Sequence, residues 1–353
     1  MFNIDNILRK NIKELVPYSS ARDEFKGEAS VFLDANENSY GSPLNRNYNR
    51  YPDPLQWKIK NRLAEIKGVP AKNIFLGNGS DEAIDILFRA FCNPGVDNVI
   101  TLPPTYGMYE VSANINDVRL RKVPLMPDYQ LNMEAIAEAI DEHTRIIFIC
   151  SPNNPTGNSI DRQDIETILT NFNGLVVIDE AYINYSRQKT FIQELTEYSN
   201  LVVLQTLSKA WGLAGLRVGM AFASEEIIEI FNKVKPPYNI NEASQELALE
   251  ALQNVDQVNN WIKETVAERE KLKIELVQIP SVLKIYPSDA NFLLVKARNA
   301  KGIYNHLVSL GIIVRDRSKV ELCEECLRIT IGTPQENIEL LNALKTFQES
   351  DKI

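Results

Sequence analysis

Short apolar runs and amphipathic stretches alternate along most of the chain. From about residue 57 onward, an apolar run rich in β-branched residues is followed by a polar or glycine-containing turn and then by apolar residues at helical spacing. The apolar runs predict strands at residues 73–76, 98–102, 145–150, 175–178, 201–206 and 217–222. Helices are predicted at residues 57–68, 81–91, 133–140 and 161–171. This alternation predicts an α/β fold whose mainly parallel sheet is covered by helices on both faces.

The pattern changes in the last third of the chain. Residues 236–277 have a helical pattern, and a smaller region follows with predicted strands at 283–286, 291–295, 312–314 and 326–331 and predicted helices at 300–310 and 335–347. This mixture is typical of an α+β domain. We therefore expect a large domain at residues 41–270 and a small domain at residues 271–353. Residues 1–40 are polar, with one amphipathic stretch, and are expected to form an N-terminal arm and part of the small domain.

The composition of the chain argues against several classes of protein. The chain has 38 basic and 47 acidic residues, a net charge of −9, which argues against a nucleic-acid-binding protein. No apolar run reaches about 18 residues, so we expect no membrane span. The first residues carry scattered charges and no apolar core, unlike a secretory signal, so a cytoplasmic protein is expected.

Histidines and cysteines are few. His143 and His306 are the only histidines of the sequence, too few for a histidine-rich metal site, and no metal is predicted. Its four cysteines do not make a disulfide framework in a chain of this length. Cys323 and Cys326 form a lone CxxC, which we interpret as a pair of ordinary thiols. The chemistry must therefore come from other side chains.

Polar clusters follow the predicted strands, one after another. They are GNGSDE at 77–82, PPTYG at 103–107, SPNNPTG at 151–157, DEAY at 179–182 and SKAWGLAGLRVG at 208–219. Each alone has a plain structural explanation, such as a helix cap or a rigid turn. In open parallel sheets, however, ligands bind beyond the carboxyl ends of the strands. Their common position therefore predicts one binding site.

The side chains in these clusters suit a single cofactor. A glycine turn before a helix suits a phosphate, and Arg217 adds a guanidinium fork. Tyr106 can stack on a flat ring, while Asn154 is a hydrogen-bonding group in a rigid turn. Asp179 can oppose a ligand cation, and a desolvated Lys209 can form a Schiff base with an aldehyde. Pyridoxal 5′-phosphate requires all of these groups.

The motifs SPNNPTG, DEAY and LSKAWGLAGLRVG resemble those of the class-II pyridoxal-phosphate aminotransferases of fold type I, and the resemblance covers nearly the whole chain. Within that family, the chain is most similar to the branch that acts on L-histidinol phosphate. This closer similarity is carried by VPY at 16–18, SAR at 20–22, LDANEN at 33–38, RYPD at 50–53, GNGSDE at 77–82 and LRITIGT at 327–333. Ser39 is a departure, since the branch commonly has proline there.

The resemblance implies a fold, a reaction and a set of site residues. The fold would be a large α/β domain with a small α+β domain. The reaction would convert L-histidinol phosphate and 2-oxoglutarate to imidazole acetol phosphate and L-glutamate, in histidine biosynthesis. Lys209 would form the Schiff base with the cofactor, Asp179 would pair with the ring nitrogen, and Tyr182 would hydrogen-bond the ring oxygen; these three are the predicted catalytic residues.

Further roles follow from the same resemblance. The cofactor would also contact Asn154 at the ring oxygen, Tyr106 by stacking, and Ser80, Asp81, Ser208 and Arg217 at the phosphate. Tyr51 would reach that phosphate from the neighbouring subunit, so a homodimer with active sites at its interface is implied. Arg328 would bind the anionic end of the substrate. The side chains expected near it are Tyr18, Asn36 and Arg315.

Other functions on related scaffolds remain open. Aromatic amino-acid aminotransferases share the cofactor motifs, and so does the threonine-phosphate decarboxylase, which also binds an amino phosphate. A DNA-binding regulator with an aminotransferase-like part is disfavoured by the net charge of −9 and the short segment before Leu33. The absence of GxGxxG disfavours a nucleotide-dependent dehydrogenase.

Overall fold

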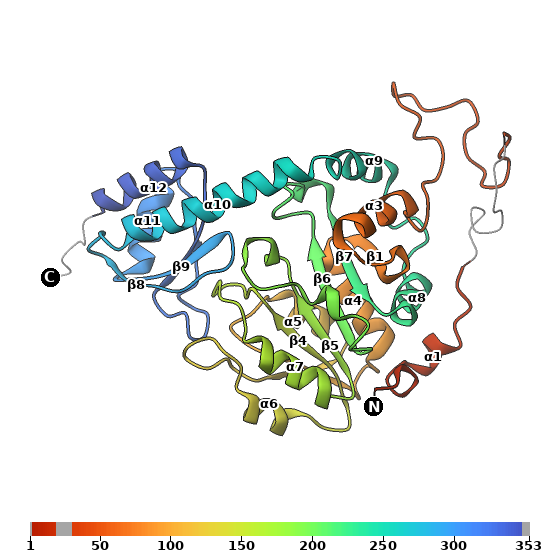
Figure 1. The fold of residues 1–353 in the computed structure, drawn as a ribbon, viewed down its shortest axis with the longest axis horizontal. Helices are drawn as coiled ribbons and strands as arrows, with labels where there is room; N and C mark the ends of the chain where they lie inside the picture. The colour runs from red at the N-terminus through yellow and green to blue at the C-terminus, as the bar shows by residue number, and fades with distance from the viewer. Residues whose placement is uncertain (1, 19–29, 348–353) are drawn as a thin grey trace.

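The computed structural model describes residues 2–18 and 30–347, and its larger part is built around one sheet (Figure 1). The sheet has seven strands in the order β1-β7-β6-β5-β4-β2-β3. Its strands are β1 (Ile74–Asn78), β2 (Asn98–Thr101), β3 (Arg119–Lys122), β4 (Thr144–Cys150), β5 (Leu175–Asp179), β6 (Leu201–Thr206) and β7 (Val218–Ala223). All neighbours are parallel except β7, which is antiparallel to both β1 and β6. The predicted mainly parallel α/β sheet is confirmed.

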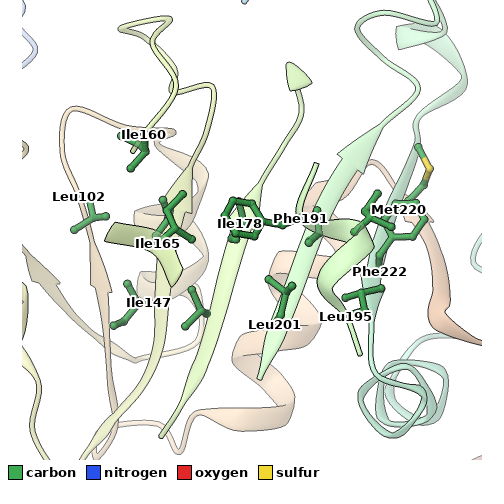
Figure 2. Close-up of a cluster of buried hydrophobic side chains, with 14 of the residues drawn as sticks. Leu102, Ile147, Ile160, Ile165, Ile178, Phe191, Leu195, Leu201, Met220 and Phe222 are labelled. Carbon is green, nitrogen blue, oxygen red and sulfur yellow. The ribbon is translucent and has the colours of Figure 1, made fainter. Parts of the chain in front are cut away.

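Helices cover both faces of this sheet. They are α3 (Trp57–Lys67), α4 (Ser80–Phe91), α5 (Met108–Ile115), α6 (Met133–Ala139), α7 (Arg162–Asn171), α8 (Glu225–Val234) and α9 (Glu242–Ala251). Successive strand residues point to opposite faces, so Ile147 joins the hydrophobic cluster under α3, α6 and α7, while Phe148 joins the cluster under α4, α5 and α8. Figure 2 shows part of the first cluster, in which Ile147 of β4 and Ile165 of α7 are labelled.

The smaller part has its own sheet and core. Four antiparallel strands lie in the order β10-β11-β9-β8. They are β8 (Val282–Ile285), β9 (Phe292–Ala297), β10 (Arg315–Asp316) and β11 (Cys326–Thr330). A third cluster packs this sheet against α11 (Ala300–Ser309), α12 (Pro334–Thr346) and the end of α10 (Val255–Leu276). The long α10 helix runs from the large part to the small part (Figure 1). The domain boundary predicted at residue 270 falls inside it and stays a prediction.

Two strand predictions differ from the structure. Residues 312–314 were expected to form a strand, but β10 begins only at Arg315. Strand β3 was not predicted, because its sequence RLRK lacks an apolar run. It lies at the edge of the sheet and its residues are exposed or half-buried, and charged residues are common on such strands.

The described part of the N-terminal arm lies on the large domain. A short 3-10 turn, Ile4–Asn6, precedes α1 (Lys10–Lys13). Ile4, Ile7 and Ile12 are buried in the cluster under α4 and α8. No helix in the described residues is long and apolar enough to cross a membrane.

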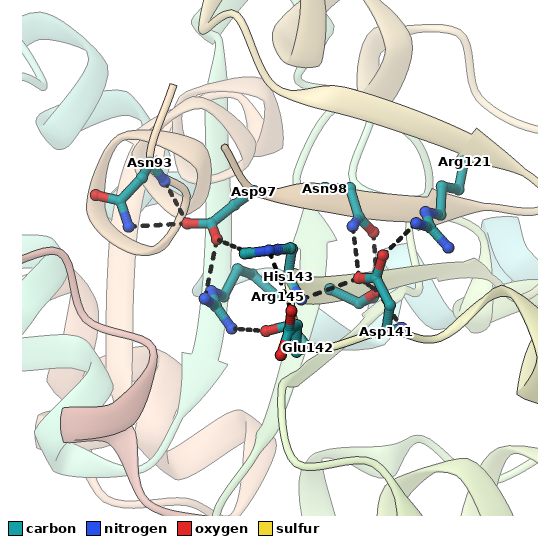
Figure 3. A network of polar contacts seen from close by, with 9 residues as sticks. Asn93, Asp97, Asn98, Arg121, Asp141, Glu142, His143 and Arg145 are labelled. Carbon is teal, nitrogen blue, oxygen red and sulfur yellow. Dashed lines mark hydrogen bonds and ion pairs between the residues drawn. The ribbon is translucent and has the colours of Figure 1, made fainter. Parts of the chain in front are cut away.

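A polar network fixes the loops at the amino ends of β2 and β4 (Figure 3). The fully buried Asp97 accepts hydrogen bonds from the backbone and side-chain amides of Asn93 and lies 2.9 Å from Arg145 Nη2. His143 belongs to this network, since its backbone N–H donates to Asp141 Oδ1 at 2.9 Å. These residues are at the edge of the sheet opposite to the strand ends where the polar clusters lie. His143 therefore belongs to a structural hydrogen-bond network that lies away from the predicted site.

Candidate active site

The polar clusters meet in one cavity of about 550 Å³ at the carboxyl ends of the parallel strands. Because β7 runs antiparallel, its first residues lie at the same edge as the ends of β1 and β6. Most of the residues predicted from the sequence line this cavity: Ser80, Asp81, Tyr106, Asn154, Asp179, Tyr182, Ser208, Lys209, Arg217, Arg315 and Arg328. Neither histidine of the chain lines it. The structure therefore brings groups that are far apart in sequence into one site.

Lys209 is the amine of this cavity. It follows β6, and its Nζ lies 5.4 Å from the centroid of the Tyr182 ring. The cavity walls remove water from around the ammonium group, which lowers the pKa of Lys209, and the positive charge of Arg328 lowers this pKa further. A lowered pKa makes the neutral, nucleophilic amine more accessible.

Asp179 is a buried carboxylate at the end of β5. Its Oδ2 accepts a hydrogen bond from the Tyr109 hydroxyl at 2.8 Å, and its Oδ1 accepts one from the backbone N–H of Ala181 at 3.1 Å. Burial raises the pKa of Asp179, while the hydrogen bond from Tyr109 acts in the opposite direction. Sequence reasoning missed Tyr109. No local pattern at residue 109 indicates this contact, because Asp179 lies 70 positions away in the sequence.

The start of α4 forms one end of the cavity. The turn before it contains Gly79, with a φ of 73°, and a Cβ atom there would lie 2.6 Å from Arg217 Nη2. A Cβ atom on Gly219 would lie 2.1 Å from the backbone nitrogen of Ser80. Only glycine therefore allows this close approach of the turn, β7 and the arginine. The helix start and Arg217 then make a compact positive cradle that suits a phosphate group.

Side chains around this cradle hold one another in place. Arg217 Nη1 is 3.5 Å from Ser208 Oγ, and its Nη2 is 3.4 Å from Asp81 Oδ2. The hydroxyl of Tyr106 donates to Asp81 Oδ1 at 3.0 Å. The Tyr106 ring meets the Tyr109 ring edge to face, with centroids 5.6 Å apart. The wall beside the cradle is therefore aromatic, as a flat ring ligand requires.

The small domain supplies the other end of the cavity. Arg328 of β11 is paired in register with Arg315 of β10. The Arg328 guanidinium lies 5.2 Å from the Phe292 ring centroid, and its Nη1 donates a hydrogen bond to Asn154 Oδ1. That bond orients the Asn154 side chain so that its amide nitrogen is the group left for a ligand. Arg317 also lines the cavity and was not predicted from the sequence.

Taken together, these features fit pyridoxal phosphate. The cradle at α4 matches its phosphate, and Asp179 matches a protonated ring nitrogen. Tyr182 and Asn154 lie on the cavity wall as possible partners for the ring oxygen, and Lys209 presents an amine in the same cavity. This cavity therefore contains groups that suit the phosphate, the ring and the aldehyde of the cofactor.

Three predicted residues lie elsewhere in this chain. Tyr51 and Asn36 line a second cavity of about 500 Å³, where the Tyr51 ring stacks on Tyr238 with centroids 4.5 Å apart. Tyr18 lies beside a different surface hollow and is 75 % exposed. The SAR motif at 20–22 falls outside the described residues. Within one chain, the structure does not bring these residues to Lys209.

The CxxC pair takes no part in the cavity. Cys323 and Cys326 are free, buried thiols in the largest hydrophobic cluster. Burial raises the pKa of Cys323 to about 11 and that of Cys326 to about 12, so both are weak nucleophiles. This environment supports the interpretation as ordinary thiols.

Comparison with known proteins agrees with this geometry. Residues 29–344 match the family model described as aminotransferase class I and II. The histidinol-phosphate aminotransferase of Parabacteroides distasonis is 57 % identical over 99 % of this chain and 100 % of its own. That of Cytophaga hutchinsonii is 55 % identical over 98 % of this chain and 99 % of its own.

Solved structures share the fold. The histidinol-phosphate aminotransferase from Sinorhizobium meliloti in complex with pyridoxal-5′-phosphate has a TM-score of 0.78 at 23 % identity, covering 88 % of this chain and 89 % of its own. The L-threonine-O-3-phosphate decarboxylase from Porphyromonas gingivalis has a TM-score of 0.73 at 23 % identity, covering 85 % of this chain and 91 % of its own. The fold alone therefore does not separate the two activities, whereas identity above 50 % over the full length of named relatives does. On these grounds the chain belongs to the class I and II aminotransferases and, within them, to the histidinol-phosphate aminotransferases.

Proposed function

We propose that the protein transfers the amino group of L-histidinol phosphate to 2-oxoglutarate, giving imidazole acetol phosphate and L-glutamate in histidine biosynthesis. The observation that carries this proposal is the position of Lys209 in one cavity between the phosphate cradle at α4 and the arginines of the small domain. A cofactor phosphate and an anionic substrate can then occupy opposite ends with the amine between them. The names and high identity of the relatives support the substrate.

The proposed cofactor contacts follow from the cavity. Ser208, Arg217 and the N–H groups at the start of α4, at Ser80 and Asp81, would hold its phosphate. Asp179 would face its ring nitrogen, with Tyr106 against the ring. When bound, pyridoxal phosphate supplies an aldehyde that condenses with amines and a ring that withdraws electrons from the carbon bearing the amine.

The chain's own groups then have separate tasks. With the cofactor bound, Lys209 Nζ would take the proton from the substrate carbon that bears the amino group and would deliver it to the carbon that carried the aldehyde. The lowered pKa of Lys209 favours the neutral amine that accepts this proton. The Asp179 carboxylate holds a proton at the ring nitrogen through its negative charge, and the Tyr109 hydroxyl keeps that carboxylate in place.

Arg328 would bind the anionic group of both substrates. L-Histidinol phosphate carries a phosphate and no carboxylate, whereas glutamate and 2-oxoglutarate carry carboxylates and no phosphate. A planar guanidinium fork pairs with either group through two parallel hydrogen bonds. The hydrogen bond from Arg328 to Asn154 connects the substrate end of the cavity with the residue proposed to contact the ring oxygen.

We further propose a homodimer in which Tyr51 completes the site of the neighbouring subunit. Tyr51 is 50 % exposed and lies outside the cavity of its own chain, yet its loop is firmly held. Glu37 accepts a hydrogen bond from the Tyr51 backbone N–H at 2.7 Å and forms an ion pair with Arg50 at 2.6 Å. A fixed, exposed tyrosine is suited to a contact across an interface. The four free cysteines fit a reducing compartment, so we place the enzyme in the cytoplasm.

Mixed dimers test the shared site. A Lys209→Ala subunit is combined with a Tyr51→Phe subunit, and the activity of the purified mixed dimer is measured at limiting pyridoxal phosphate. We expect one of its two sites to regain the wild-type rate, because that site has Lys209 from one subunit and Tyr51 from the other. Activity equal to the average of the two parent dimers would show that Tyr51 acts within its own chain or not at all.

A substrate comparison tests the proposed reaction. With 2-oxoglutarate as acceptor, we expect kcat/KM for L-histidinol phosphate to exceed that for L-tyrosine or L-phenylalanine by about tenfold or more, because only the phosphate engages the arginine end as a dianion. Glutamate formation is the readout, and carbon dioxide release from O-phospho-L-threonine is measured in parallel. A preference for the aromatic amino acids, or carbon dioxide release as the main activity, would overturn the substrate assignment.

A further inference from the structure

Three arginines of the small domain face the same side of its sheet. Arg315 and Arg328 are register partners on neighbouring antiparallel strands, so their side chains leave the sheet on one face. Arg317 lies two residues after Arg315, and its backbone N–H donates to Cys326 O at 2.8 Å, which continues the pairing beyond β10. Side chains alternate along an extended strand, so Arg317 shares the face of Arg315. Asp316, between them, points away and lies 3.5 Å from Lys301 Nζ.

These three guanidinium groups line the cavity without a carboxylate partner among the described residues. Arg317 Nε is buried and has no hydrogen-bond partner in the described structure. Burial lowers the pKa of Arg317, and the nearby Arg315 lowers it further. Like charges on directly opposite residues of neighbouring strands destabilise a sheet. An arrangement of unpaired cations in a cavity indicates that an anionic ligand supplies the missing negative charge.

The anionic groups of the two substrates differ in charge and in the number of oxygens that can accept hydrogen bonds at this end of the cavity. The phosphate of L-histidinol phosphate is mainly a dianion at neutral pH and presents three acceptor oxygens, whereas each carboxylate of 2-oxoglutarate is a monoanion with two. Arg328 and Arg315 offer two forks, which suffice for one carboxylate. A third guanidinium therefore stabilises the phosphate, with its additional oxygen and second negative charge, more than it stabilises a carboxylate.

We propose that Arg317 is a specificity-determining residue that favours the phosphate of the amino donor over a carboxylate at the same end of the cavity. This inference rests on the proposed function, because it concerns the donor and acceptor of that reaction. Arg328 and Arg315 bind both anions, while Arg317 adds its fork to the phosphate. The alternation of arginine and aspartate at 315–317 was the sequence signal for this residue.

Arg317→Gln removes the charge and leaves a shorter polar side chain. We expect kcat/KM for L-histidinol phosphate to fall about ten- to a hundredfold, as for loss of one charge-assisted contact. The value for 2-oxoglutarate should fall less than about threefold, since each substrate is processed in its own half of the reaction. Competitive inhibition by inorganic phosphate should weaken in parallel. Arg317→Lys keeps the charge and should recover part of the loss.

The matched control is Arg119→Gln, which removes an exposed arginine on β3 outside the cavity and should behave as wild type. The visible absorption of the bound cofactor shows whether each variant is folded and loaded. Unchanged kcat/KM for both substrates, an equal fall for both, or a larger fall for 2-oxoglutarate would each overturn the role of Arg317. Failure of the wild-type protein to use L-histidinol phosphate would instead overturn the proposed function.

Discussion

Replacement of Lys209 by alanine is expected to reduce glutamate formation by at least about 10⁴-fold, because it removes both the nucleophilic amine and the general base. No other lysine lines the cavity in the described part of the chain, so no neighbouring amine can substitute. Initial rates of glutamate formation at saturating substrates measure the loss. The visible absorption that arises when the protein binds pyridoxal phosphate through an amine should disappear in the same variant.

The control for this change is Lys122→Ala. Lys122 is an exposed lysine on β3 that forms an ion pair with Glu110 at 2.7 Å, and surface pairs of this kind contribute little to stability. We expect its rate and absorption to match those of the wild type. If the Lys209→Ala protein retained a rate near that of the wild type, the assignment of the cavity as the active site would be wrong.

Replacement of Asp179 by asparagine is expected to lower kcat about a hundred- to a thousandfold, a magnitude typical of losing one electrostatic contact in an active site. Asparagine has nearly the same shape and can still accept a hydrogen bond from Tyr109. It lacks the negative charge that would hold a proton at the ring nitrogen of the cofactor. Measurement of kcat together with the amount of bound cofactor separates a chemical defect from a loss of binding.

Tyr109→Phe provides the comparison for Asp179→Asn. It removes a neutral hydrogen-bond donor at 2.8 Å and leaves the carboxylate in place. The fall in kcat should therefore be much smaller than for Asp179→Asn. Equal effects of the two substitutions would show that position 179 acts through packing and hydrogen bonding, and that its charge is not needed.

Much of the large domain could be predicted because the chemistry follows the strand pattern. Asp179 comes directly after four buried apolar residues, and Lys209 follows β6 by three positions, so both were expected at one edge of the sheet. The direction of β7 could not be read from an apolar run, since such runs are alike in parallel and antiparallel neighbours. That reversal is what brings Arg217, just before β7, to the phosphate cradle.

Other features depend on contacts that the sequence does not contain. Tyr109 meets Asp179 from a residue 70 positions away, and nothing local to either residue indicates the pair. Arg317 directly follows the short strand β10, and the pairing of this segment with β11 decides which way its side chain points. The apolar run at 312–314 suggested a strand in the wrong place, because its residues precede β10 and do not pair. Tyr51, Asn36 and Tyr18 lie outside the Lys209 cavity of their own chain, and the contribution of Tyr51 to the site of a neighbouring subunit stays a prediction.

The most direct test of the account is a single half-reaction. The purified protein, loaded with pyridoxal phosphate, is mixed with L-histidinol phosphate in the absence of any oxo acid while its visible absorption is recorded. We predict that stoichiometric L-histidinol phosphate removes the visible band and releases imidazole acetol phosphate, and that 2-oxoglutarate then restores the band with formation of L-glutamate. An unchanged spectrum with L-histidinol phosphate, alongside a change with L-tyrosine or O-phospho-L-threonine, would contradict the proposed function.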